Sequence, residues 1–351
     1  MVEKSTIFGN MTIDEFWDVA LRYDVERLSP EDCDGGDDDH DKCDYNDSDH
    51  DGGAVVNQLS RRYTIPTFGD THGNPLILNL ASLPLTDGIW SPLGAQAWYG
   101  SALLSALLLR PCPSSPDAVG TDRTNFLLEE RLHLLKTTLN ENCTVLELGS
   151  GAVGLSGITA GWVSSHNKGG VDDQTEICAT SITRRHIILT DNEPRILRQL
   201  ERNDKTSLNT LTQLYPNKTL PHMSVAKLDW NDDAAIVDQL VPAGSKLKLV
   251  IGSELVYTDE SATACANLVL TLLQKYPNLL ILIVQVSDRD GWETVFLPTV
   301  RAQKGIHVMV EPLVDSDVHL IASKMVPQGG TLDSRFDFCA CYIRSQDGSD
   351  W

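Results

Sequence analysis

The sequence predicts an α/β fold: a seven-stranded, mostly parallel sheet with helices on both faces and an N-terminal extension made of a helix and a hairpin. Three observations support this prediction. From residue 144 onward, short apolar stretches alternate with longer amphipathic ones. A glycine-rich turn follows directly after the first apolar stretch. The last two apolar stretches have no helical pattern between them, so one of these strands is predicted to run antiparallel at that edge of the sheet.

The chain begins with a segment that is separate in character from the rest. Residues 11–28 have an amphipathic pattern behind Thr12, a candidate N-cap, and are predicted to form a helix. Residues 31–53 follow, and the part from Glu31 to Asp51 holds eleven acidic residues and one lysine. A tract this polar has too few apolar side chains to form a core, and we therefore expect a disordered acidic insertion there.

The next part of the chain is predicted to pack on the sheet. Residues 61–85 have the pattern of a β-hairpin with its turn at 69–74. Apolar helices are expected at 93–109 and 125–139, separated by a loop rich in Pro, Ser and Asp. The predicted units are therefore an N-terminal helix (residues 1–30), an acidic insertion (31–53), a hairpin and helix packed on the core (54–124), and a Rossmann-like domain (125–351).

The alternating pattern places each element of the sheet. Strands are predicted at 145–148, 187–190, 224–228, 247–251, 279–286, 307–310 and 336–343. Helices fit between them near 153–161, 193–207, 232–240, 259–275 and 291–304. Residues 169–183 look like a polar insertion before the second strand.

Composition limits the classes of function. The chain has 351 residues and a formal net charge of -21, which argues against nucleic acid as a partner and favours a basic protein or peptide. No stretch approaches the ~20 apolar residues of a membrane helix, and no secretory signal pattern opens the sequence. We expect a monomer in the cytoplasm, with the nucleus as the alternative. Eight cysteines without a C-x-x-C motif indicate buried reduced thiols, and no histidine spacing suggests a metal site.

The strongest local motif is the turn after the first strand. Gly149, Ser150 and Gly151 lead into a predicted helix, and Gly154 completes a G-x-G-x-x-G spacing. That spacing alone also fits a dinucleotide site. Glu147 argues against a dinucleotide, because a carboxylate there would repel a pyrophosphate but not a ligand with a cation and hydroxyls. The motif therefore favours S-adenosylmethionine over NAD or FAD.

Polar residues also follow the next three strands, and the carboxyl ends of parallel strands meet at one edge. Asp191 is placed to accept hydrogen bonds from ribose hydroxyls, while Asp229 and Trp230 offer an acceptor and an aromatic face to an adenine. Glu254 and Tyr257 follow the fourth strand. Together these residues predict one crevice lined by four strand ends.

These motifs resemble the seven-β-strand protein methyltransferases of methyltransferase family 16, many of which methylate protein lysines. The resemblance runs from about residue 89 to 344 and includes Trp90, the glycine turn, Asp191, the Asp229-Trp230 pair, and the segments 254–257 and 287–292. It implies S-adenosylmethionine as cofactor, with Trp90 and Glu254 also beside it. It further implies catalytic roles for Glu254, which stands where the family has Asp, and for Tyr257 beside the target amine.

Other interpretations of these residues remain open. The glycines could serve only a tight turn, Asp191 and Asp229 could cap helices, and Tyr257 and Trp90 could be packing residues. Asp288 and Trp292 are expected to begin a helix and pack it rather than to contact a substrate.

The function also has alternatives. The acceptor could be a histidine or a small molecule, or the fold could be a catalytically silent scaffold. An NAD-dependent oxidoreductase is disfavoured by Glu147.

Overall fold

The computed structural model describes residues 59–65, 76–82, 99–109, 134–135, 137–139, 143–166, 185–214, 216, 220–231, 235–325 and 336–345. The predicted helix at 11–28, the acidic tract at 31–53, the polar insertion at 169–183 and Trp90 lie outside these residues. Of the predicted helix at 125–139, the described residues 134–135 and 137–139 are helical.

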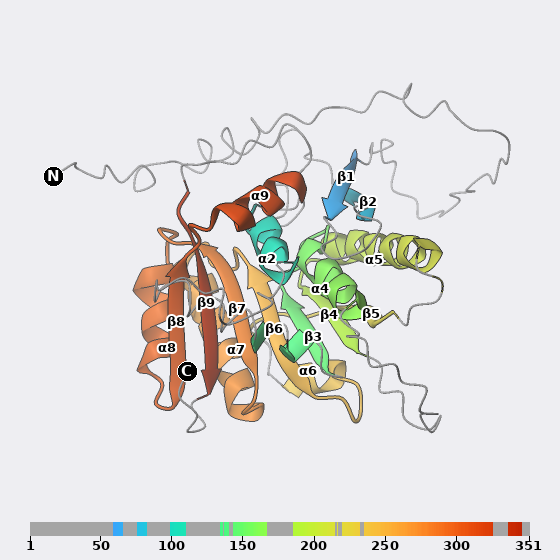
Figure 1. The fold of residues 1–351 in the computed structure, drawn as a ribbon. Coiled ribbons are helices and arrows are strands. Elements are labelled where there is room, and N and C mark those ends of the chain that lie inside the picture. Colours follow the sequence, from blue (N-terminus) through green and yellow to red (C-terminus); the bar gives the residue numbers. More distant parts are fainter. Residues whose placement is uncertain are drawn as a thin grey trace, which may run out of the picture.

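The main sheet contains all seven predicted strands, and the fold is Rossmann-like (Figure 1). The strands are β3 (Thr144–Leu148), β4 (His186–Asp191), β5 (His222–Lys227), β6 (Leu247–Ser253), β7 (Leu280–Val286), β8 (Ile306–Pro312) and β9 (Phe338–Ser345). Their order is β5-β4-β3-β6-β7-β9-β8. The pairs from β5 through β7 are all parallel, which confirms the mostly parallel sheet.

At the far edge of the sheet, one of the last two strands runs antiparallel, which confirms the prediction: β9 lies between β7 and β8 and pairs antiparallel with both. The prediction that no helix lies between these two strands is wrong, because α9 (Ser316–Met325) follows β8 and precedes β9. This helix is short and begins beside Asp315, whose side chain accepts a hydrogen bond from the N–H of Val318 (3.4 Å). Its buried residues Val318, Ile321, Ala322 and Met325 have the i, i+3, i+4, i+7 spacing of an amphipathic helix, so the signal is present in the sequence.

Helices cover both faces of the sheet because successive strand residues point to opposite sides. On β6, Leu249 and Ile251 join the core beneath α2, α4 and α5, whereas Val250 between them joins the core beneath α6, α7 and α8. The helices are α2 (Tyr99–Leu109), α4 (Leu155–His166), α5 (Pro194–Leu214), α6 (Ala235–Leu240), α7 (Asp259–Lys275) and α8 (Leu297–Ala302). The predicted helix at 291–304 is divided into a π-helical turn, η3 (Trp292–Phe296), and α8.

The predicted hairpin is present as β1 (Leu59–Ile65) and β2 (Leu76–Ser82), paired antiparallel. It is held to the main domain by Asn203 of α5. The side chain of Asn203 accepts from the N–H of Ala81 (2.9 Å) and donates to its carbonyl (2.8 Å). It also donates to the carbonyl of Ala152, after the glycine turn (2.7 Å). The Asn203 side chain therefore links the hairpin to the segment that follows the glycine turn.

Helix α2 is a central element of the fold. It packs against α4 and α9 and on strands β6 and β7 (Figure 1). All of its residues from Ala102 to Leu109 are buried, as is Gly100. A helix that is apolar on every side is stable only when it is enclosed, and α2 meets this condition.

The described cysteines agree with the predicted reduced thiols. Cys143, Cys265, Cys339 and Cys341 are free and buried. Cys339 and Cys341 are two residues apart on β9 and point into the same core, as their spacing predicts. No helix within the described ranges is long and apolar enough to cross a membrane.

Candidate functional site

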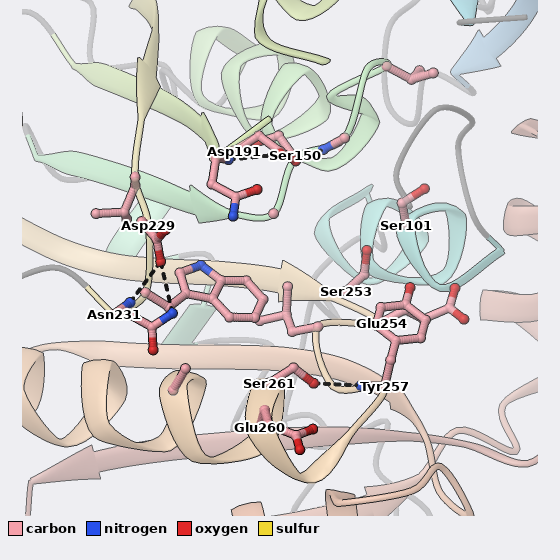
Figure 2. A pocket seen from close by; sticks show the side chains of 18 of the residues that line it. Ser101, Ser150, Asp191, Asp229, Asn231, Ser253, Glu254, Tyr257, Glu260 and Ser261 are labelled. Carbon is pink, nitrogen blue, oxygen red and sulfur yellow. Dashed lines mark hydrogen bonds between the residues drawn. The ribbon is translucent and has the colours of Figure 1, made fainter. Parts of the chain in front are cut away.

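The carboxyl ends of β3, β4, β5 and β6 surround a cavity of about 340 Å³. Figure 2 shows Ser150, Asp191 and Asp229 on one side of it, and Ser101 and Glu254 on the other. Eight of the ten predicted site residues line it: Gly149, Ser150, Gly151, Asp191, Asp229, Trp230, Glu254 and Tyr257. Trp90 lies outside the described residues. The structure thus brings together motifs from four separate strand ends.

The glycine turn requires its glycines. Gly149 and Gly151 have φ of 58° and 62°, in the left-handed region that side chains rarely adopt. A Cβ on Gly149 would also come within 3.0 Å of Leu255 and 3.4 Å of the Trp230 ring. Ser150 fixes the turn to β4: its N–H donates to the carbonyl of Thr190 (2.8 Å) and its Oγ accepts from the N–H of Thr190 (3.1 Å).

Glu147 does not reach the cavity surface. Its carboxyl group is buried behind the turn and lies against Gly157 of α4, where a Cβ would be only 2.6 Å from Oε2. Burial raises the pKa of Glu147 to about 7, although hydrogen bonds from Ser150, Gly157 and Ser156 oppose the rise. Contact between Glu147 and a cofactor stays a prediction, and this geometry favours an indirect role in supporting the turn.

Asp191 ends β4, and its carboxylate is bonded to two neighbouring segments. Its Oδ2 accepts from the N–H of Gly151 (3.2 Å), which ties it to the glycine turn. Its Oδ1 accepts from the N–H groups of Asn192 (2.8 Å) and Glu193 (3.1 Å), which organises the start of α5. Burial raises the pKa of Asp191, and these hydrogen bonds oppose the rise. The same carboxylate also lines the cavity, so it is available to a ligand's hydroxyls.

Asp229 and Trp230 form the wall after β5. Asp229 Oδ1 accepts from the backbone N–H and the side-chain amide of Asn231 (2.9 and 3.1 Å), which closes a local turn. The Trp230 ring is partly buried, beside Gly149 and against the core under α7. The pair therefore supplies both a turn and a cavity wall.

Glu254 and Tyr257 lie at the other end of the cavity. The Glu254 carboxylate is buried; its Oε2 accepts from the N–H of Gly100 (2.9 Å) and its Oε1 pairs with Arg289 (3.5 Å). Burial raises the pKa of Glu254, while Arg289 and the Gly100 N–H act in the opposite direction. Burial also raises the pKa of Tyr257, with a further contribution from the Glu254 charge, so this phenol is neutral at physiological pH.

Several residues at the Glu254 end of the cavity were not among the predicted site residues. Ser101 of α2 and Glu260 and Ser261 of α7 line the cavity, and Arg289 and Gly100 hold Glu254. Arg289 falls within the matched segment 287–292, but nothing in its local pattern indicates a partner 35 positions earlier. Trp292 is buried and stacks on Phe296 with ring centroids 4.7 Å apart, as its predicted packing role requires.

The charge of the cavity distinguishes between cofactor classes. Its described lining includes the carboxylates of Asp191, Asp229, Glu254 and Glu260 and no Lys, Arg or His side chain. Phosphate groups would be repelled by such a lining. S-adenosylmethionine has a sulfonium, an ammonium and ribose hydroxyls and no phosphate, and it fits the acceptors that are present. In the described part of the chain, no group of three or more His, Cys, Asp or Glu residues could hold a metal ion.

Three solved structures are similar to the chain over 70% of its length. They are an O-methyltransferase from Bacillus cereus in complex with SAH (13% identical, 90% of that chain covered, TM-score 0.36), the human methyltransferase 10 domain containing protein (10%, 96%, 0.35) and a methyltransferase from Pyrococcus furiosus (12%, 95%, 0.33). These likenesses are too remote to carry an argument about the acceptor.

A family model gives a more specific result. The model described as lysine methyltransferase matches residues 92–303, more than half of the chain. This range includes the glycine turn and every described strand end that lines the cavity. No curated protein matches the sequence. The chain therefore belongs to methyltransferase family 16, and it is a methyltransferase that uses S-adenosylmethionine as its cofactor.

Proposed function

We propose that this methyltransferase transfers a methyl group to a lysine side chain of a protein. The observation that carries the proposal is a second hollow, of about 550 Å³, which shares Tyr257 and Glu260 with the cofactor cavity. Its lining has one guanidinium, that of Arg289, and five carboxylates: Asp259, Glu260, Asp288, Asp290 and Glu293. A basic segment beside the target lysine would complement this charge, which supports a basic protein as the substrate.

The cofactor end of the cavity is assigned to the glycine turn and Asp191. When bound, S-adenosylmethionine supplies a methyl group activated by a sulfonium. Asp191 would accept hydrogen bonds from the ribose hydroxyls, and its own bond from Gly151 would hold it in place. The Trp230 ring would cover one face of the adenine. Alignment of donor and acceptor supplies most of the rate enhancement in such a transfer, so these residues act by fixing position.

The acceptor end has to handle a proton. A lysine ammonium has no lone pair, and releasing its proton at pH 7 costs about 4–5 kcal/mol, since its pKa is about 10.4 in water. A desolvated position beside Tyr257 would lower that cost. Because the pKa of Tyr257 is raised, its phenol cannot act as a base; it can only hold the nitrogen by a hydrogen bond. Glu254 would act by orienting the amine or by passing its proton to water.

One observation favours a second acceptor class. Both oxygens of Glu254 already have partners, in Gly100 and Arg289, so the carboxylate is less available to an ammonium. A histidine side chain is largely neutral at pH 7 and needs no such carboxylate. Methylation of a protein histidine is therefore the alternative.

The experiment is to incubate the purified chain with S-adenosylmethionine labelled with tritium in its methyl group and with a cell extract. The labelled proteins are then hydrolysed, and the methylated amino acids are separated by chromatography. We expect the label in methyllysine. Tyr257→Phe should reduce it, whereas Glu201→Gln, an exposed change on α5, should not.

Each other result has a defined meaning. Label found only in methylhistidine would replace lysine with the alternative acceptor. Label confined to molecules other than protein would reject a protein substrate. No label at all, from a chain that binds S-adenosylhomocysteine in calorimetry, would leave a catalytically silent scaffold.

A further inference from the structure

The loop that follows β6 holds its key residue in a costly conformation. Glu254 has φ of 48°, and within the described ranges it is the single non-glycine residue with a positive φ. A backbone in this region persists only when surrounding contacts enforce it, and such residues concentrate at functional sites. The contacts that enforce it here can be identified one by one.

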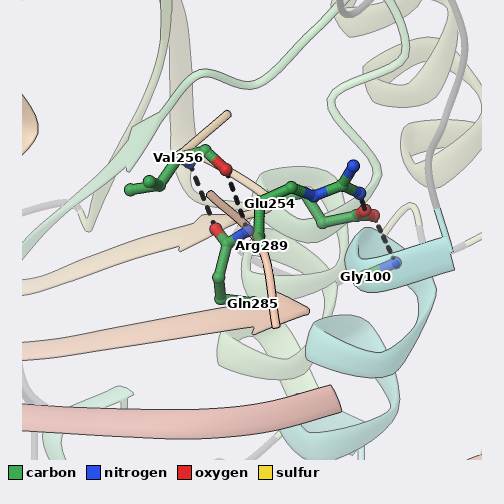
Figure 3. Close-up of polar contacts among 5 residues, drawn as sticks. All are labelled: Gly100, Glu254, Val256, Gln285 and Arg289. Carbon is green, nitrogen blue, oxygen red and sulfur yellow. Dashed lines mark hydrogen bonds and ion pairs between the residues drawn. The ribbon is translucent and has the colours of Figure 1, made fainter. Parts of the chain in front are cut away.

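The backbone of the loop is fixed by Gln285 of β7. Its side-chain amide donates to the carbonyl of Val256 (3.1 Å) and accepts from the N–H of Val256 (3.2 Å), and both residues are buried (Figure 3). Glu254 itself donates its N–H to the carbonyl of Val284 (2.8 Å). These bonds attach the loop to the neighbouring strand, but none of them involves the side chain of Glu254 or of Tyr257.

The side chain of Glu254 is held by two groups from distant parts of the chain. The N–H of Gly100, in the first turn of α2, donates to Oε2 at 2.9 Å. The approach depends on the absence of a side chain, because a Cβ on Gly100 would lie 2.7 Å from Cγ of Glu254. Arg289 reaches Oε1 from the other side, at 3.5 Å (Figure 3).

Arg289 contacts both residues of the acceptor end. Its guanidinium carbon also lies 5.2 Å from the centre of the Tyr257 ring, within the range of a cation–π interaction. The ion pair is well buried, with side-chain exposures of 13% for Arg289 and 4% for Glu254. The backbone of Arg289 is anchored in turn: its N–H donates to Val286 and its carbonyl accepts from Trp292. The guanidinium is therefore in a position to fix both side chains at once.

We propose that Arg289 is a positioning residue of the methyl-transfer site, which holds the carboxylate of Glu254 against α2 and the ring of Tyr257 at the acceptor end of the cavity. This inference rests on the proposed function, because it assigns Tyr257 to the acceptor. The planar guanidinium suits the task, since one face can cover an aromatic ring while its edge donates to a carboxylate. Arg289 acts through Glu254 and Tyr257.

The test measures tritium transfer from labelled S-adenosylmethionine to extract protein at a fixed extract concentration. It gives two quantities: the maximal rate and the KM for S-adenosylmethionine. Arg289→Gln should lower the maximal rate by roughly 10- to 100-fold, the size expected from a small misplacement of reacting groups. The KM should stay within about twofold, because Arg289 does not line the cofactor cavity. Arg289→Lys should recover part of the rate, since it keeps the charge and loses the planar face.

The matched control is Arg301→Gln, which removes an exposed guanidinium from α8 and should leave both quantities unchanged. If Arg289→Gln does not fold, the double change Glu254→Gln with Arg289→Gln replaces it, because no buried charge is then left without a partner. We expect the double variant to fold and to transfer methyl slowly.

The possible failures are distinguishable. An unchanged maximal rate in Arg289→Gln, or a double variant with the wild-type rate, would overturn the positioning role alone. A KM for S-adenosylmethionine that rises as much as the rate falls would do the same, since it would indicate a general loss of site structure. A wild-type chain that labels no protein would overturn the proposed function, and this inference with it.

Discussion

Replacing Glu147 with Gln should change how the stability of the protein depends on pH. Glu147 is fully buried, and burial raises its pKa from 4.5 to about 7. Its folded-state pKa therefore lies above its unfolded value, so between these values the folded state holds the proton more tightly. The contribution of Glu147 to stability falls as pH rises through this window and becomes constant above it. The whole fall corresponds to about 3 kcal/mol.

The assay is urea unfolding, followed by circular dichroism, of the wild type and of Glu147→Gln from about pH 5.5 to 8, away from the isoelectric point near 4.7. Glutamine stays neutral, so it lacks the cost of ionising a buried group. The stability of the variant relative to the wild type should improve by about 2 kcal/mol across this range, the part of the window that the assay covers. Histidines titrate here too, but they contribute equally to both proteins.

A stability difference that does not change with pH would refute this reasoning, because it would mean that Glu147 ionises in the folded state as readily as in water. Glu201→Gln, an exposed change on α5, is the matched control and should leave the pH dependence as it is in the wild type.

Three further predictions concern the cavity and its surroundings. Gly100→Ala should destabilise the protein by about 1–3 kcal/mol in urea unfolding, because its new methyl group would clash with Glu254. Gly161→Ala is the control and should show no such loss. Its Cβ would meet only side-chain atoms, at 3.2 Å or more, in Met223, Pro221 and Ile187. Asp191→Ala should weaken S-adenosylhomocysteine binding in calorimetry by at least roughly tenfold, the loss of one charged hydrogen bond, and retained affinity would contradict its role. Deletion of residues 31–53 should leave that affinity unchanged if the acidic tract is separate from the domain, whereas a large loss would place the tract at the site.

The sequence predicted the features that depend on local pattern. Strand periodicity located all seven strands of the sheet, and the glycine spacing located the turn, because left-handed backbone at Gly149 and Gly151 restricts which residue can stand there. The rule that parallel strands share their carboxyl edge also predicts that Asp191 and Glu254 line one cavity, as they do.

Features that depend on long-range packing were not predictable in this way. The insertion of β9 between β7 and β8 is a choice of strand order, which the pattern within each strand does not record. The burial of the Glu147 carboxyl group is another such feature, because it depends on α4 packing over β3, and contact of this residue with a cofactor stays a prediction. The pairing of Arg289 with Glu254 joins residues 35 positions apart, through a loop whose course only the folded chain determines.

The burial of α2 has a consequence for the order in which the protein can be assembled. This helix carries Ser101 to the cavity and the N–H of Gly100 to Glu254, and it packs against α9. Domains form as units while synthesis proceeds from the N-terminus, and α9 is made some 200 residues after α2. A nascent chain that ends before Ser316 can pair its first strands, yet it lacks one of the surfaces that enclose α2. The helix that supplies Ser101 to the methyl-transfer cavity is therefore fully enclosed only after α9 has left the ribosome.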